Sequence, residues 1–274
     1  MLLSGMANDS SFAKEGFFSG EVEKEARLFH DRNTQYFTLY RRIASLGYKT
    51  ISELQNNSRD VRRGIVTCLV IRTLSCYDAI RLCIEKGMEF ETRVLLRSQL
   101  EAMYTVSACE KDKEFHKVFI KASTRDKHRI LSRILQHHEK AKVYTKKELE
   151  QTVSDLKAKI DNKDVPKLLT KEIAQKAGMD VSYNIVYSFY SLAVHVNPVS
   201  LQEYLVWDDN VGIKEIVWGP KYDHGISSML SSMNTMIVCL LGAAKIFNLN
   251  MEAELKEILK QWDKLGNKLK KKTK

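Results

Sequence analysis

Glycine and proline are scarce in this sequence, and their scarcity narrows the possible folds more than any other feature. The chain of 274 residues contains twelve Gly and three Pro. Because both residues mark turns and interrupt helices, such low numbers favour long helices over short strands joined by turns. Hydrophobic residues make up 44% of the chain, which is enough for a full core. The sequence therefore predicts a mainly α fold, a multi-helix bundle.

Apolar residues at helical spacing predict where the long helices lie. They are residues 21–46 ended by Gly47, 59–86 ended by Gly87, 89–108, 183–195 ended by Asn197 and Pro198, 223–248, and 251–269, with a short helical turn at 49–56. One segment, "LQEYLVWDDNVGIKEIVWGP", instead alternates and is rich in Val, Ile and Trp. Its two halves flank the turn-forming "DDNVG", so we expect one β-hairpin inserted near 201–218.

Charge divides the chain into three parts. We expect a loose N-terminus at 1–18, a single helical domain at 19–262 and a basic tail at 263–274. Within the domain, residues 110–178 contain 18 Lys or Arg, 11 Asp or Glu and four of the seven His. They predict a charged, solvent-rich helical excursion from the one core. The six lysines from Lys264 onwards contribute +6 to the net charge of +10. It is expected to be disordered and solvated, or else to attract nucleic acid.

The cysteine pattern and the absence of targeting signals indicate a cytoplasmic protein. The five Cys are an odd number and form no C-x-x-C pair, which suits a reducing compartment. The N-terminal segment lacks the features of a signal peptide, and the apolar run at 236–247 is too short to cross a bilayer. Phosphate-loop, dinucleotide, serine-hydrolase and zinc-protease motifs are missing, so we expect no cofactor, no metal and no membrane.

A first group of candidate site residues lies in the helix at 89–108. Arg97 and Glu101 are one turn apart at the edge of an apolar stripe, with Ser98 and Tyr104 close by. An arginine held by a carboxylate can present its guanidinium to a phosphate or carboxylate. The pair can equally be a modest structural salt bridge.

A second group lies in the helix at 183–195. Tyr187, Ser191 and His195 are spaced i, i+4, i+8 and so follow one line, and Asn197 comes just after them. A histidine near a helix C-terminus can act as acid or base, or bind phosphate. Alternatively, the Tyr and Ser side chains bond to nearby backbone and His195 caps the helix.

The stretches "LLRSQLEAMY" (95–104) and "YSFYSLAVHVNP" (187–198) resemble the paired motifs of an uncharacterised bacterial family of helical proteins. That domain of unknown function has an L-R-S-x-x-E helix and a later Y-x-x-x-S-x-x-x-H-x-x-P helix. The resemblance would cover roughly residues 60–245. It implies that seven residues meet in space: Arg97, Ser98, Glu101, Tyr187, Ser191, His195 and Pro198.

The chain is more distantly similar to HEPN proteins, which are helical, often dimeric, and in many cases metal-independent ribonucleases of defence and toxin systems. This similarity implies that His195 exchanges a proton and that Arg97 stabilises phosphate charge. Together with Glu101 they are the expected catalytic residues, and Ser98, Tyr104, Tyr187, Ser191 and Asn197 are expected to bind substrate. However, Arg97 and His195 lie on different predicted helices, unlike the family pattern. The expected function is that of a bacterial defence- or toxin-type helical protein, a homodimer, that acts on RNA or a nucleotide. Metal-independent nuclease activity is one form that this function can take, and whether the protein is an enzyme stays open. The alternative is a binding or scaffold protein in which the Arg–Glu–His group is an anion pocket or a structural network.

Overall fold

The computed structural model describes residues 11–54, 60–141, 145–162, 165–195, 198–208, 210 and 212–272. In these ranges the chain forms helices and one two-stranded sheet, so the predicted mainly α fold with an inserted hairpin is confirmed. The elements in chain order are α1 (Ser11–Glu15), η1 (Gly16–Phe18), α2 (Gly20–Arg32), α3 (Thr34–Glu53), α4 (Val61–Glu85), α5 (Glu89–Lys111), α6 (Phe115–Gln136), α7 (His138–Ala141), α8 (Lys146–Asp161), α9 (Thr170–Lys176), α10 (Asp180–Ser182), η2 (Tyr183–Tyr187), α11 (Ser188–Ser191), α12 (Pro198–Leu201), η3 (Gln202–Tyr204), β1 (Leu205–Asp208), β2 (Gly212–Ile216), α13 (Gly225–Phe247) and α14 (Glu252–Lys272).

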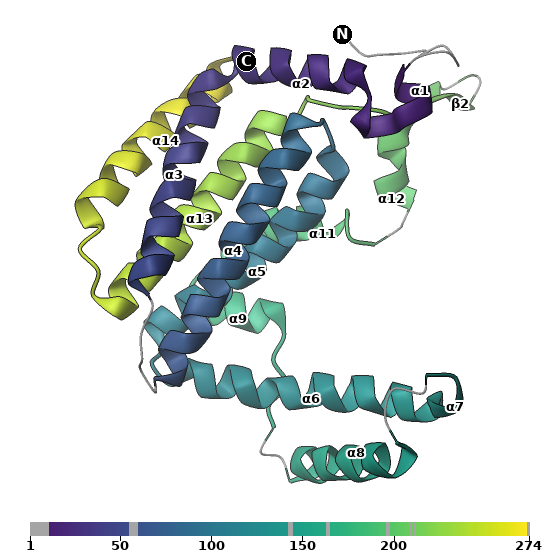
Figure 1. Cartoon of the computed structure of the whole chain (residues 1–274), viewed down its shortest axis with the longest axis vertical. Coiled ribbons are helices and arrows are strands. Elements are labelled where there is room, and N and C mark those ends of the chain that lie inside the picture. The colour runs from purple at the N-terminus through teal and green to yellow at the C-terminus, as the bar shows by residue number, and fades with distance from the viewer. Residues whose placement is uncertain are drawn as a thin grey trace.

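Helix α13 forms the centre of the bundle and contacts α3, α4, α5 and α14. Figure 1 shows these long helices running side by side. Met233, Ile237 and Leu240 of α13 are completely buried. Among the described residues α13 is also the one helix long and apolar enough to cross a membrane, but most of it is buried in the bundle. The apolar run at 236–247, predicted to be too short to cross a bilayer, is thus part of a longer helix whose burial is that of a core helix.

Two stacked tyrosines join α3 to α4 in the core. The ring centroids of Tyr40 and Tyr77 are 3.7 Å apart. The Tyr77 hydroxyl donates to the backbone oxygen of Tyr40 at 3.1 Å, and the Tyr40 hydroxyl donates to that of Tyr77 at 2.5 Å. Ser232 of α13 lies 3.1 Å from the Tyr40 hydroxyl. Both buried phenol groups therefore have hydrogen-bond partners, as buried polar groups require.

Two glycines expected to end helices behave differently. Gly87 ends α4 as predicted, in the left-handed region at φ +70°. Gly47 does not end a helix, because α3 continues through it to Glu53. A Cβ at Gly47 would lie 3.0 Å from Leu74 Cδ1 and 3.1 Å from Met236 Cε. The glycine thus permits close packing of α3 on α4 and α13.

The N-terminal region is more structured than expected. Within 11–18, predicted to be loose, the chain forms α1 and η1, and Phe12 is buried against Trp218 with ring centroids 4.8 Å apart. The helix predicted at 21–46 is also divided in two. Asn33 adopts φ −121° and its side-chain amide donates to the Phe29 oxygen at 2.9 Å, which separates α2 from α3.

The charged segment 110–178 forms an arm whose helices α6 and α8 pack on each other. In Figure 1 these two helices project away from the axis of the bundle. Thr145 and Glu148 form a reciprocal capping box at the start of α8. Arg125 of α6 donates to the backbone oxygen of Val165 at 2.7 Å and ties the arm to the segment that leads back to the bundle.

The predicted helix at 183–195 is irregular. The helical segment begins earlier, with α10 at Asp180. Residues 183–187 form the π-helical turn η2, and regular helix ends at Ser191. Pro198 does not end this helix. It begins α12, where a missing backbone N–H has no cost. The antiparallel hairpin that follows pairs Leu205 with Ile216, within the predicted range.

The C-terminal tail also differs from the expectation. Helix α14 continues to Lys272, through most of the segment predicted to be a disordered basic tail. Leu265 is buried and Leu269 packs on the core, while Lys264, Lys268, Lys270 and Lys271 are exposed. The apolar side chains among the lysines give this end of the helix a face that can pack against the bundle.

Candidate functional site

The first part of the candidate site is an ion pair on α5. Arg97 Nη1 lies 3.2 Å from Glu101 Oε1, and the two side chains remain 25% and 36% exposed. The i, i+4 spacing places both on the face of α5 that meets η2 and α11. The pair is neither fully buried nor freely solvated.

The second part comes from η2 and α11. The Tyr187 hydroxyl donates to Glu101 Oε1 at 2.8 Å, and Arg97 Nε donates to Ser191 Oγ at 3.3 Å. The Arg97 guanidinium also lies 4.9 Å from the centre of the Tyr187 ring, at cation–π distance. The structure thus brings together Arg97, Glu101, Tyr187 and Ser191, which we name the Arg–Glu–Tyr–Ser cluster.

The π-helical turn helps to position this cluster. The Ser188 hydroxyl donates to the Tyr183 oxygen five residues earlier, and the rings of Tyr183 and Tyr187 stack with centroids 4.9 Å apart. Turns of this kind occur frequently at functional sites. The apolar periodicity predicted a regular helix here, so sequence reasoning missed the turn.

His195 does not take part in the contacts that form the cluster. It lies in a bend beyond the end of α11, and its side chain is exposed. The predicted line from Tyr187 through Ser191 to His195 therefore breaks after Ser191, because the chain leaves the helix there. Asn197, also predicted to bind substrate, lies outside the described residues.

The remaining candidates, Ser98 and Tyr104, have other partners. Ser98 Oγ accepts a hydrogen bond from Arg72 Nη2 at 3.0 Å, which links α5 to α4. The hydroxyls of Tyr104 and Ser182 lie 2.9 Å apart. Burial raises the pKa of Tyr104 to about 12, so its phenol is neutral at physiological pH.

The environment of Tyr187 also favours its neutral form. Burial raises the pKa of Tyr187, and its hydrogen bond to Glu101 raises the pKa further. A neutral phenol can donate to the carboxylate, whereas a phenolate would repel it. Tyr187 therefore holds Glu101 in place as a hydrogen-bond donor and does not act as a base.

Glu101 also lines a cleft of about 480 Å³ between α4, α5, α6 and the start of α9. Its volume is within the range of small-molecule sites. The polar lining residues are Arg72, Ser98, Glu101, Thr105, Ser123, Asp126 and Thr170, and the apolar ones include Phe119, Leu168 and Ile173. The cleft therefore combines one guanidinium, two carboxylates, several hydroxyls and an aromatic ring. Of the predicted site residues, it contains Ser98 and Glu101.

Sequence reasoning missed Arg72 and a second ion network on α5. Buried Arg93 forms an ion pair with Glu203 of η3, and its Nη2 lies 3.9 Å from Glu89 Oε2. Its guanidinium carbon lies 5.4 Å from the centre of the Phe189 ring. The i+4 spacing of Glu89, Arg93, Arg97 and Glu101 is visible in the sequence and could have revealed Arg93. Glu203 is far away in sequence and gave no such signal.

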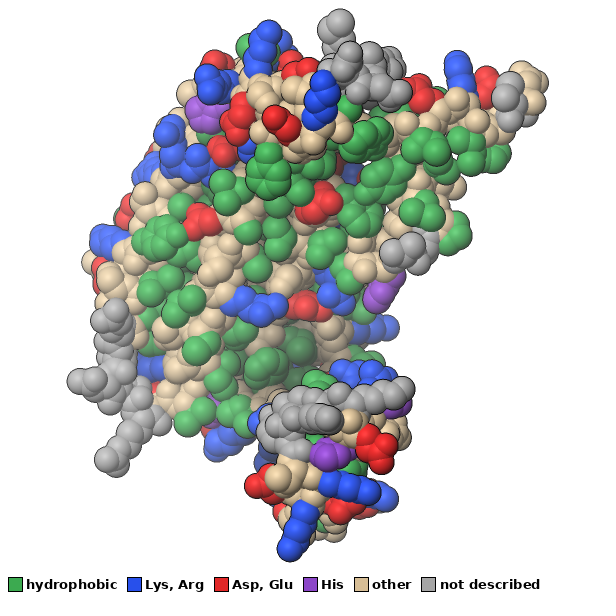
Figure 2. Space-filling view, turned by 45° about the vertical axis from the view of Figure 1, so that its right-hand side comes forward, with side chains coloured by type: hydrophobic (Ala, Val, Ile, Leu, Met, Phe, Trp, Pro, Cys, Tyr) green, Lys and Arg blue, Asp and Glu red, His purple; other side chains and the backbone are tan. Residues whose placement is uncertain are grey.

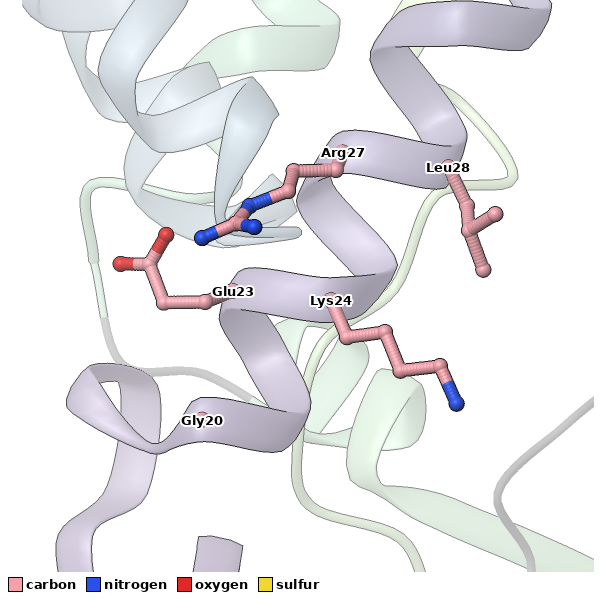
Figure 3. Close-up of a pocket in the computed structure, with 5 residues that line it drawn as sticks. All are labelled: Gly20, Glu23, Lys24, Arg27 and Leu28. Carbon is pink, nitrogen blue, oxygen red and sulfur yellow. The ribbon is translucent and has the colours of Figure 1, made fainter.

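Two other features of the described residues do not form a comparable site. Within the described ranges, no group of three or more His, Cys, Asp or Glu side chains is arranged to hold a metal ion. A second hollow of about 470 Å³ lies on α2. Figure 3 shows Glu23 and Arg27 on one side of that helix, with Lys24 and Leu28 on the other. Because a single helix lines it, this hollow lacks the converging groups of the cleft beside α5.

Comparison with known proteins defines the class to which this fold and its paired motifs belong. The model of a family of unknown function, DUF5677, matches residues 63–213, more than half of the chain. The protein belongs to this family, and the predicted resemblance to an uncharacterised helical family is confirmed. No curated protein and no solved structure matches the chain. The similarity to HEPN proteins stays a prediction.

Proposed function

We propose that the protein binds a nucleotide, free or at the end of an RNA strand, in the cleft between α4, α5 and α6. The observation that carries this proposal is the presence of Arg72, Phe119 and Glu101 around one cleft of about 480 Å³. Each of these three groups matches a different part of a nucleotide.

Arg72 supplies the group for the phosphate. A guanidinium can bind phosphate oxygens through two parallel N–H bonds. Ser98 Oγ accepts from Arg72 Nη2 and so orients the guanidinium, leaving its other donors for a ligand.

Phe119, Glu101 and Asp126 supply groups for the base and the ribose. Bases stack on aromatic rings, and such stacking contributes about 1–3 kcal/mol per base. The two carboxylates can accept hydrogen bonds from ribose hydroxyls or from an amino group of the base. Tyr187 and Arg97 both bind Glu101 and fix its position.

The test is calorimetric titration of the full chain with the four ribonucleoside monophosphates and with a short RNA carrying a 5′ phosphate. Arg72→Gln should weaken binding by roughly 10- to 100-fold, since a charged hydrogen bond contributes about 1.5–3 kcal/mol. The matched control is Arg41→Gln, which removes the same charge from an exposed position on α3 outside the cleft. Equal affinities of the two variants, or no binding by the parent protein, would contradict the proposal.

The catalytic alternative, a metal-independent nuclease that uses Arg97 and His195, has less support. Arg97 is held by Glu101 and Ser191, and the cluster contacts do not include His195. Incubation of RNA with the protein in EDTA tests it. If the protein cleaves RNA, and His195→Ala abolishes the cleavage without lowering the melting temperature, the result favours a nuclease with a defence or toxin role.

A further inference from the structure

Two groups of exposed apolar side chains lie on either side of Arg93. On α10, η2 and α11, Val181, Ile185 and Phe189 point outward at i, i+4 and i+8. On the hairpin and just after it, Trp207, Ile216 and Trp218 are exposed. Ile185, Trp207 and Ile216 are each at least 65% exposed. We name these six residues the apolar face.

The two halves of the apolar face are connected through Arg93. Its guanidinium stacks on Phe189 and pairs with Glu203, which lies in the turn just before β1. Figure 2 shows hydrophobic side chains gathered over the hairpin side of the molecule. The helix that carries Phe189 packs its other face on α5, so Phe189 lies on its outward side and is exposed.

The area of the apolar face matches what a homodimer needs. With full side-chain areas of about 200 Å² for aromatic and about 100–150 Å² for aliphatic residues, the six side chains expose roughly 600 Å². A monomer's largest apolar patch is about 300–600 Å². A standard-size interface buries about 800 Å² per partner, and about 65% of a homodimer interface is apolar. The apolar face thus supplies the roughly 500 Å² of apolar area that a standard-size dimer needs.

The charge of this region disfavours an anionic membrane or nucleic acid as the occupant. Residues 181–220 contain one basic residue, Lys214, and four acidic ones, Glu203, Asp208, Asp209 and Glu215. The chain as a whole carries a net charge of +10. Surfaces that bind anionic lipid or nucleic acid are rich in Lys and Arg.

We propose that a second copy of this chain covers the apolar face, in a two-fold symmetric dimer. Two-fold symmetry needs a single patch that packs against itself, and it is the commonest arrangement of soluble oligomers. The inner face of the same helix carries Tyr187 and Ser191, so the dimer would brace the Arg–Glu–Tyr–Ser cluster from behind. This proposal does not depend on the ligand of the cleft.

The test is sedimentation equilibrium of the full chain at micromolar concentration. The expected mass is twice the 31.6 kDa of one chain. Ile185→Glu and, separately, Trp207→Glu should weaken self-association by roughly tenfold or more, because each would place a charge in an apolar interface. The control is Ile130→Glu, which changes an equally accessible isoleucine, 53% exposed, on the arm helix α6. It should leave the dimer intact.

Each other outcome would overturn the proposal. A wild-type protein that is monomeric at these concentrations has no such dimer. A dimer that survives both substitutions uses another surface. The wild-type protein is also tested with phosphatidylcholine vesicles. If it is monomeric, co-sediments with the vesicles, and no longer does so as Ile185→Glu, the apolar face is a lipid-binding surface. Circular dichroism of each variant checks that it is folded.

Discussion

The hydrogen bond between Tyr187 and Glu101 should stabilise the fold measurably, because it joins η2 to α5 at a buried phenol. The hydroxyl donates to Glu101 Oε1 at 2.8 Å, and the same oxygen lies 3.2 Å from Arg97 Nη1. Glu101→Ala removes the acceptor and leaves the Tyr187 hydroxyl without it, at a cost of about 1–3 kcal/mol. Loss of the partly exposed ion pair adds about 0.3–0.5 kcal/mol.

We therefore expect Glu101→Ala to lower the free energy of unfolding by about 1.3–3.5 kcal/mol. Tyr187→Phe removes only the hydroxyl and keeps the ring beneath Arg97, so it should cost about 1–2 kcal/mol. In the double variant no phenol lacks its partner. The two losses should consequently be less than additive, with a coupling energy of about 1–2 kcal/mol.

The assay is urea unfolding followed by circular dichroism for the wild type, both single variants and the double variant. The matched control is the pair formed by Tyr48 and Asp78, another tyrosine–carboxylate hydrogen bond, which lies at an exposed position. Its coupling energy should be below about 0.5 kcal/mol, as for exposed polar pairs. Additive effects of Glu101→Ala and Tyr187→Phe, or equal coupling in the two pairs, would refute this account of the cluster.

Three further predictions concern the rest of the fold. Gly242→Ala would bring a Cβ to 2.9 Å from Val106 Cγ1 and should destabilise the fold by about 1–3 kcal/mol. A Cβ at Gly64 would meet no neighbouring atom within 4 Å, so Gly64→Ala should stabilise the fold by about 0.4–1 kcal/mol. Urea unfolding that ranks the two variants in the opposite order would contradict this packing. Burial raises the pKa values of Tyr104 and Tyr222 to about 12, so the folded chain keeps protons that the unfolded chain loses above about pH 10. The free energy of unfolding should therefore fall as the pH rises from about 10 to about 12. If Tyr104→Phe leaves the slope of this free energy against pH unchanged, the prediction is wrong. Deletion of 264–274 removes buried Leu265, whose backbone oxygen accepts from the Tyr36 hydroxyl at 3.4 Å, and should lower the free energy of unfolding by about 2–4 kcal/mol. Deletion of 270–274 should lower it by less than about 0.5 kcal/mol. Equal melting temperatures of the two truncated proteins would show that the end of α14 does not stabilise the bundle.

The architecture could be predicted because its signals are local. Apolar periodicity located α4, α5 and α13, and the change of period at 201–218 located the hairpin. The errors occurred where a distant contact overrides a local signal. Gly47 suggested a helix end, but its role is to let Leu74 and Met236 approach. The lysines of the tail suggested disorder, but Leu265 packs on the bundle.

The candidate site was predicted in part for the same reason. The i+4 spacing on α5 and the Tyr–Ser pair on the later helix identified Arg97, Glu101, Tyr187 and Ser191, which the structure brings together. His195 was expected to extend the line, but the chain leaves the helix after Ser191. Arg72 and Phe119 could not be found, because only the packing of α4 and α6 against α5 places them around one cleft.

The most direct test of the central claim is a crystal structure of the protein soaked with the monophosphate that binds best in solution. We predict density for the nucleotide between α4, α5 and α6, with its phosphate on Arg72 and its base against Phe119. The Tyr187 hydroxyl should still donate to Glu101 in that structure. A nucleotide bound elsewhere, or an empty cleft at a concentration that saturates binding in solution, would contradict the account.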